Sequence, residues 1–247
     1  MKIYTMEQHL LDNSTNPEWL DARAGHFTGS DFHQYMPLLK TGKLSETAKK
    51  ELSKKILENF GYRFDTFQTP AMQRGIELEP TAREAYSFVY GKDIQEVGFV
   101  DLEKYHAGCS PDGVIYEETS VLDDIECRKD INGELTLIQT KPKLFKIQRI
   151  KEIVEIKCPM IETFVSYLDD EFMNAEYYTQ MQFNMFITGA DVCHFVVYHP
   201  DFNLIVRDIP KDEEMQNKIQ TALEKLQGMY DEMYERISKQ KLETVGE

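Results

Sequence analysis

Hydrophobic residues recur at helical spacings in the first third of the chain and in two later segments. The clearest case follows Pro70, where apolar side chains return every three or four residues until Gly91, a residue type that commonly ends helices. The residues of this pattern are Met72, Ile76, Ala82, Ala85, Tyr86 and Val89. It predicts a long, buried helix over about 70–90. Similar signals predict a short helix from Pro17 and longer helices over about 46–60, 174–188 and 211–241.

Between and after these helices the pattern changes to short runs rich in Val and Ile, which are typical of strands. The predicted strands cover about 94–102, 113–117, 120–127, 135–140, 147–157, 192–198 and 204–208. Asn132-Gly133 is a strong hairpin-turn signal. The order of elements predicts an α/β (α+β) fold, in which one domain over residues 1–247 holds a central mixed β-sheet flanked by helices. We expect its core over about 17–210.

Composition narrows the class of protein. Hydrophobic residues make up 41% of the 247 residues, enough for a core, so a disordered acidic chain is excluded although the formal net charge is −15. The longest apolar runs fall far short of the roughly 20 residues of a membrane span. The four cysteines have no CxxC spacing, and the N-terminus has no apolar signal core, so we expect a cytoplasmic protein. The charge disfavours general affinity for nucleic acid but allows a local basic channel.

Charged side chains gather around one predicted strand and one turn. Side chains alternate between the faces of a strand, so Glu155 and Lys157 point the same way, opposite to Val154 and Ile156. Upstream, Asp112 lies in a Ser-Pro-Asp-Gly turn directly before another strand. A carboxylate and an ammonium on a buried strand, close to a second acid, indicate a catalytic site.

The helix over 70–90 adds a further acid. Glu77 and Glu79 lie about 200° apart around the helix, so only one of them can face the sheet. Glu79 shares a face with Ala82, Arg83 and Tyr86 and is the preferred candidate, with Glu77 as the alternative.

These oxygen atoms suit a metal ion. Carboxylates of Asp112, Glu155 and Glu79, with the backbone carbonyl of Ile156, are the ligands that Mg²⁺ prefers. Lys157 beside the ion would orient or deprotonate an attacking water. The residues therefore predict metal-assisted hydrolysis of a phosphodiester.

The Asp…Glu-x-Lys arrangement resembles the PD-(D/E)xK nuclease superfamily, and a longer ordered series of motifs is similar to the phage lambda exonuclease family, also called YqaJ-like viral recombinases. The resemblance covers about Trp19 to Pro200. Its motifs are Trp19…Arg23…Thr28-Gly29-Ser30-Asp31, Gly75…Glu79…Ala82-Arg83…Tyr86, Cys109-Ser110-Pro111-Asp112-Gly113, Val154-Glu155-Ile156-Lys157-Cys158-Pro159 and Tyr177…Gln180-Met181-Gln182…Met185…Thr188-Gly189.

The resemblance implies roles for particular residues. Asp112, Glu155 and Glu79 would bind metal and Lys157 would activate water. Gln182, rather than Gln180, would support the site from its helix. Arg23 and Ser30 would hold a terminal 5′-phosphate, a task that suits the planar guanidinium of arginine.

The resemblance also implies a function. The chain would be a Mg²⁺-dependent exonuclease, with Mn²⁺ as a substitute, that degrades one strand of linear double-stranded DNA from its 5′ end. It would be phage- or prophage-encoded, act in the bacterial cytoplasm with a single-strand annealing protein, and form a homo-oligomer, a trimeric ring, without a membrane partner. Two alternatives stay open: an endonuclease or nickase on the same core, and a non-catalytic DNA-end-binding protein.

One departure from the family is the separation of 42 residues between Asp112 and Glu155. The extra segment, about 118–151, is predicted to be an inserted hairpin with one acidic and one basic arm. The basic residues are Lys141, Lys143, Lys146, Arg149 and Lys151, and all but Lys146 share strand parity. They would either follow DNA or neutralise the acidic arm.

Overall fold

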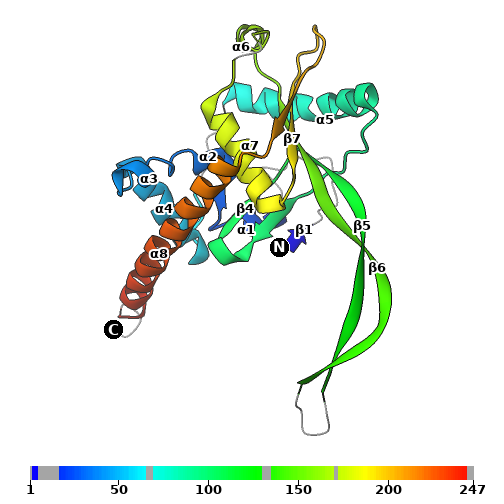
Figure 1. Cartoon of the computed structure of the whole chain (residues 1–247). Helices are drawn as coiled ribbons and strands as arrows, with labels where there is room; N and C mark the ends of the chain where they lie inside the picture. Colours follow the sequence, from blue (N-terminus) through cyan, green and yellow to red (C-terminus); the bar gives the residue numbers. More distant parts are fainter. Residues whose placement is uncertain (1, 5–16, 65–68, 130–134, 170–171, 244–247) are drawn as a thin grey trace.

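The computed structural model describes residues 2–4, 17–64, 69–129, 135–169 and 172–243. It contains two mixed β-sheets with helices packed against them (Figure 1). In the described part of the chain, no helix is long and apolar enough to cross a membrane.

Four longer helices carry the packing: α4 (Glu46–Asn59), α5 (Pro70–Tyr90), α7 (Ala175–Thr188) and α8 (Glu213–Glu243). Their ends follow the caps in the sequence, since the side chain of Thr69 accepts a hydrogen bond at the start of α5 and Gly91 ends it with φ 63°. The predictions for these helices are confirmed to within two residues at each end. The shorter helices are α1 (Pro17–Arg23), α2 (Gly29–Phe32), α3 (Leu38–Thr41) and α6 (Ile161–Ser166).

The first sheet has the strand order β1-β3-β4-β2 and is built from short strands: β1 (Lys2–Tyr4), β2 (Phe27–Thr28), β3 (Phe99–Leu102) and β4 (Ala107–Cys109). The second has the order β5-β6-β7-β8, with β5 (Gly113–Lys129), β6 (Leu135–Lys157), β7 (Val192–Val197) and β8 (Ile205–Pro210). In the second sheet the β6–β7 pair is parallel, whereas the β5–β6 and β7–β8 pairs are antiparallel.

The predicted α/β (α+β) fold, with mixed β-structure flanked by helices, is confirmed. The strands are divided between two mixed sheets rather than gathered in one central sheet. The chain leaves the first sheet after Cys109 and enters the second at Gly113. Pro111 lies between them, and because proline lacks an N–H and fixes φ, it cannot continue a ladder of backbone hydrogen bonds. The turn that carries Asp112 is thus the junction of the two sheets.

The predicted inserted hairpin is a continuation of β5 and β6 rather than a separate pair of strands. From Tyr116 and Ile150 outward, the two strands pair only with each other in the described residues, and they form a ribbon that projects from the body (Figure 1). The predicted Asn132-Gly133 turn lies outside the described residues.

Two register shifts interrupt the ribbon, so the shared parity expected for its basic residues does not hold along the whole arm. Asp123 pairs with Lys143, but Ile125 already pairs with Gln139. Pro142 lies within this shift, and its missing N–H accounts for the broken ladder. The second shift lies nearer the body, where Ile115 pairs with Glu152 and the next residue, Tyr116, pairs with Ile150.

The strand β6 separates two apolar layers. Ile153 belongs to the main core, which includes residues of α7 and α8, whereas Val154, Ile156 and Cys158 pack with Ala82 and Tyr86 of α5. The alternation of faces predicted for this strand is confirmed, because successive residues enter opposite layers. As a result α7 lies over one face of β6 and α5 over the other.

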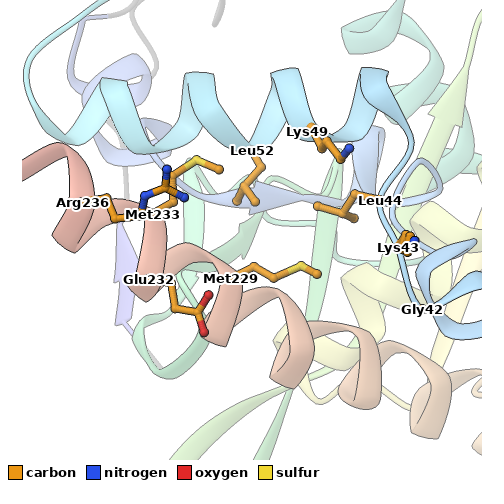
Figure 2. Close-up of a pocket in the computed structure, with 9 residues that line it drawn as sticks. All are labelled: Gly42, Lys43, Leu44, Lys49, Leu52, Met229, Glu232, Met233 and Arg236. Atoms are coloured by element: carbon orange, nitrogen blue, oxygen red, sulfur yellow. The ribbon is translucent and has the colours of Figure 1, made fainter.

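A cavity of about 280 Å³ lies between α4 and the second half of α8. Leu44, Leu52, Met229 and Met233 supply much of its lining, with Lys43, Lys49, Glu232 and Arg236 around them (Figure 2). None of its lining residues comes from the strands or turn that carry the predicted catalytic residues. The site below is therefore elsewhere in the molecule.

Candidate active site

The two charged residues at the end of β6 point towards α7. Lys157 Nζ lies 2.6 Å from Glu155 Oε1 and 4.7 Å from the centre of the Tyr177 ring. The other oxygen of Glu155 accepts a hydrogen bond from Asn184 Nδ2 at 3.1 Å. Only 1% of Glu155 is exposed, and its two oxygens contact two protein donors, Lys157 and Asn184.

Asp112 lies at the edge of the same strand. Its Oδ2 atom accepts a hydrogen bond of 2.6 Å from the backbone N–H of Ile156. This contact is a consequence of register, because Gly113, the first residue of β5, pairs with Val154. The turn thus brings Asp112 beside Glu155 although 42 residues separate them in the sequence.

The third carboxylate comes from α5. Glu79 forms an ion pair with Arg83, one turn later, whose Nε atom donates to the backbone carbonyl of Asp112 at 2.7 Å. Glu77 is exposed and accepts a hydrogen bond from Gln73 on its own helix. Of the two glutamates left open by the sequence, Glu79 is therefore the one beside the cluster.

The charges of this cluster act on one another. Burial, then the negative charges of Glu155 and Glu79, raise the pKa of Asp112 well above its ordinary value. Burial and the charge of Glu155 also raise the pKa of Glu79, against the opposing effect of Arg83. Burial lowers the pKa of Lys157, but the carboxylates of Glu155 and Asp112 outweigh it and raise that pKa overall. The lysine is thus an ammonium ion at neutral pH.

These residues fit a divalent cation by donor type and by charge. Burial, and then repulsion from neighbouring carboxylates, raises the pKa of Asp112 and of Glu79, and a cation would relieve that repulsion. In this arrangement each carboxylate instead binds a protein donor. Among the residues that the structure describes, no three His, Cys, Asp or Glu side chains are positioned together as a ready metal site.

Gln182 is not part of the cluster, contrary to the expectation from its motif. Its side chain is buried towards the start of α8, where it donates to Pro210 O at 2.9 Å and accepts from Asp212 N at 3.0 Å. Asn184, about 200° further around α7, takes the position next to Glu155. The sequence contained one usable signal, since Asn184 lies seven residues after Tyr177 and therefore on its face of the helix.

A second polar group lies at the start of α2. Arg23 Nη2 donates to Ser30 Oγ at 3.0 Å and to Thr28 Oγ1 at 3.2 Å, and its guanidinium lies 4.9 Å from the centre of the Trp19 ring. Burial lowers the pKa of Arg23, but the ordinary value is so high that the group stays charged. The two residues expected to bind a terminal phosphate are thus in direct contact.

Gly29 connects this group to the carboxylates. A Cβ atom at Gly29 would lie 2.3 Å from Asn184 Oδ1, so α2 and α7 approach as closely here as a glycine permits. Asn184 in turn binds Glu155. The Arg23–Ser30 pair and the acidic cluster therefore lie on either side of one asparagine.

At the base of the ribbon, two of the predicted basic residues are paired with an acid. Arg149 contacts Glu117 at 2.9 Å and Asp191 at 2.9 Å, and Lys151 contacts Glu117 at 3.4 Å. Here the neutralising interpretation of the hairpin charges holds. The side chains of Lys141, Lys143 and Lys146 lie outside the described residues.

The sequence matches one family model, and the fold is similar to those of proteins of known structure. The family model described as the YqaJ-like viral recombinase domain matches residues 18–191. The fold is similar to that of an alkaline exonuclease (LHK-Exo) from Laribacter hongkongensis, with a TM-score of 0.70 and 24% identity over 93% of this chain and 100% of that chain. The crystal structure of LHK-Exo in complex with dAMP matches over the same shares of both chains, with a TM-score of 0.68 and 24% identity.

A phage-related exonuclease from Haemophilus somnus 129PT is also similar in fold, with a TM-score of 0.54 and 17% identity over 86% of this chain and 96% of that chain. No curated protein matches the sequence significantly. At these identities the likeness to solved structures shows a shared fold.

Proposed function

The chain belongs to the family of YqaJ-like viral recombinase domains, and from this premise we propose that it is a Mg²⁺-dependent exonuclease acting on linear double-stranded DNA. It would hydrolyse one strand from the 5′ end and leave a 3′ single strand for recombination by strand annealing. Mn²⁺ is expected to substitute for Mg²⁺. Two proteins of known structure with a similar fold are described as exonucleases, in agreement with the proposal.

One observation carries the proposal: the register of two strands brings Asp112 beside Glu155 and Lys157, and Glu79 on α5 is near enough for their charges to act on one another. Asp112 and Glu155 meet through the register of β5 and β6, and Glu79 reaches the same edge from α5. A structural ion pair would need one acid and one base. An excess of buried and half-buried acids, by contrast, is suited to binding a divalent cation at a phosphodiester.

Asp112, Glu155 and Glu79 would hold the metal, with the carbonyl oxygen of Ile156 as a further ligand. When bound, the metal lowers the pKa of a water molecule and neutralises charge on the phosphate. The protein's part is to hold these carboxylates in place. The Ile156 N–H and Asn184 fix the orientations of Asp112 and Glu155.

Lys157 would act as a cation that donates hydrogen bonds. Because its pKa is raised, it carries its proton at neutral pH and cannot itself accept one from water in this arrangement. Its Nζ atom, held by Glu155 and the Tyr177 ring, would orient the attacking water or stabilise negative charge on the phosphate. This favours the orienting role over the deprotonating one.

The Arg23–Ser30 pair would bind the terminal 5′-phosphate, and one asparagine separates it from the carboxylates. By family resemblance the proposal also includes a single-strand annealing protein as partner and a trimeric ring around the DNA. The enzyme would act in the cytoplasm of the bacterial host.

The proposal is tested with end-labelled linear duplexes in Mg²⁺ and in chelator. We expect stepwise release of nucleotides from the 5′ end in Mg²⁺ only. Cutting of covalently closed circles would instead identify an endonuclease. DNA binding without any cleavage would identify an end-binding protein and refute the proposal.

Two glutamates on one helix provide a matched comparison for the site. Glu79→Gln and Asp112→Asn should each reduce cleavage by orders of magnitude, since each removes an expected metal ligand. Glu77→Gln removes the same charge two residues away on the exposed side of α5 and should leave the rate unchanged. Equal activity of the Glu79→Gln and Glu77→Gln proteins would show that the helical ligand is wrongly assigned.

A further inference from the structure

One arginine stands in the apolar stripe with which α5 faces the sheet. Leu78, Ala82 and Tyr86 recur every four residues and pack against the β6 layer. Arg74 continues the same spacing one turn earlier. It therefore lies on the side of α5 that faces β6, at the end of the strand where Lys157 is the last residue.

The guanidinium of Arg74 has no partner among the residues that the structure describes. Its Nε atom is buried and makes no hydrogen bond, and no described carboxylate lies within ion-pair distance of the side chain. Arg83, on the same helix, differs because it is bonded to Glu79 and Asp112. A buried guanidinium N–H without a hydrogen bond costs free energy, so a ligand that brings acceptor oxygens would be favoured there.

Cys158 connects the stripe of α5 with the end of β6, because it follows Lys157 directly and packs in one apolar layer with Ala82 and Tyr86. Burial and then the carboxylates of Glu79 and Asp112 raise the pKa of this thiol to about 12. The positive charges of Arg74 and Lys157 act on it in the opposite direction. The charges of Arg74, Glu79, Asp112 and Lys157 thus all act on one buried thiol just beyond the end of β6.

We propose that Arg74 binds a backbone phosphate of the DNA strand being degraded, adjacent to the phosphodiester that is hydrolysed. The proposal rests on the function proposed above and adds a residue that positions the substrate. Its chemistry is the pairing of a planar guanidinium with two phosphate oxygens. The carboxylates of Asp112, Glu155 and Glu79 repel phosphate. The positive charge of Arg74 would offset that repulsion where the DNA strand enters the site.

The first test measures binding of a linear duplex in chelator, so that no cleavage occurs. Arg74→Gln should weaken binding and reduce the slope of log K against log salt by nearly one unit, the effect of one lost phosphate contact. Arg236→Gln on α8 is the matched control, because it removes the same charge from an exposed residue beside the remote cavity. Identical slopes for the two variants would overturn the proposal.

The second test uses duplexes in which single phosphates near the 5′ end are replaced by neutral methylphosphonates. In single-turnover cleavage, one position should slow the wild type about tenfold to a hundredfold, the effect of one charge-assisted hydrogen bond. In the Arg74→Gln protein, which already lacks the contact, a methylphosphonate at that position should cause no further loss of rate. Arg74→Lys, which keeps the charge but loses the fork, should give an intermediate rate.

The outcomes separate the two proposals. If the wild type cleaves and Arg74→Gln is slowed equally on all duplexes with a lowered melting temperature, Arg74 is structural and this inference fails while the nuclease function stands. If the wild type releases no nucleotides in Mg²⁺, the proposed function itself fails. If the Arg74→Gln protein keeps the wild-type rate and salt slope, Arg74 makes no phosphate contact and this inference fails.

Discussion

Gly29 is predicted to be intolerant of even one added methyl group, because α2 and α7 meet at this residue. Its backbone does not have a positive φ, so space rather than conformation requires glycine. In Gly29→Ala, the new Cβ atom would lie 2.3 Å from Asn184 Oδ1 and 3.2 Å from Gln180 Cγ. Asn184 would have to move by about 1 Å to restore an ordinary contact.

That movement breaks a buried hydrogen bond. Asn184 donates to Glu155 Oε2 at 3.1 Å, and a hydrogen bond to a charged group contributes about 1.5–3 kcal/mol. Overpacking adds about 1–3 kcal/mol, and the lower entropy of the unfolded alanine chain returns somewhat less than 1 kcal/mol. We therefore expect Gly29→Ala to lower the free energy of unfolding by about 2–5 kcal/mol.

Equilibrium unfolding in urea measures this loss. Gly228→Ala on α8 is the matched control, since a Cβ atom there meets nothing within 4 Å. Alanine in place of an interior helical glycine should raise stability by about 0.5–1 kcal/mol. The two substitutions add the same atom but should change the free energy of unfolding in opposite directions.

A double-mutant cycle tests the cause. Asn184→Ala removes the clashing atom, so adding Gly29→Ala to it should cost much less than Gly29→Ala costs alone. If the two losses are additive, the reasoning about Asn184 is refuted.

Three further predictions concern the end, the ribbon and pH. Arg23→Ala should erase most of a wild-type preference for 5′-phosphorylated over 5′-hydroxyl duplex ends, expected to be about ten- to hundredfold, and equal wild-type rates on both ends would contradict the assignment. If the ribbon follows DNA, replacing three of its lysines by glutamine should flatten the salt dependence of duplex binding, whereas an unchanged slope with a lower melting temperature would assign them to neutralising the acidic arm. The three are Lys141, Lys143 and Lys151. Although burial opposes it, hydrogen bonds from Lys92 and His194 lower the pKa of Glu152. The ionised Glu152 therefore stabilises the fold above its unfolded pKa of about 4.3, and this stabilisation is lost as the pH falls through the lower folded pKa. The urea midpoints of the wild type and of Glu152→Gln should converge in acid.

The part of the site that follows strand geometry was predictable from the sequence. A strand alternates its faces, so the common direction of Glu155 and Lys157 follows from their spacing alone. The caps at Thr69 and Gly91 likewise fixed the ends of α5. These features depend on neighbours in the sequence, where the physical rules are strongest.

Features that depend on packing were not predictable in the same way. On α7, residues of every face are buried, including Gln182, Phe183 and Asn184, so no polar face indicates which amide turns towards the carboxylates. The division into two sheets depends on which distant strands pair after Pro111. Arg74 is typical of a solvated helix residue until the layer beneath Leu78 and Ala82 is known.

The position of the two acids at the base of the ribbon makes the length of that ribbon free to vary. Removing equal numbers of residues from both arms leaves Gly113 opposite Val154, and the site keeps its geometry. An unmatched residue in one arm would instead turn both Glu155 and Lys157 to the opposite face of the strand, unless a bulge absorbed the extra residue. Such a bulge is present between Ile150 and Glu152. A search pattern that fixes the number of residues between the Asp112 turn and the Glu155 strand therefore excludes chains of this kind, whereas one that fixes only the motif on each side recovers them.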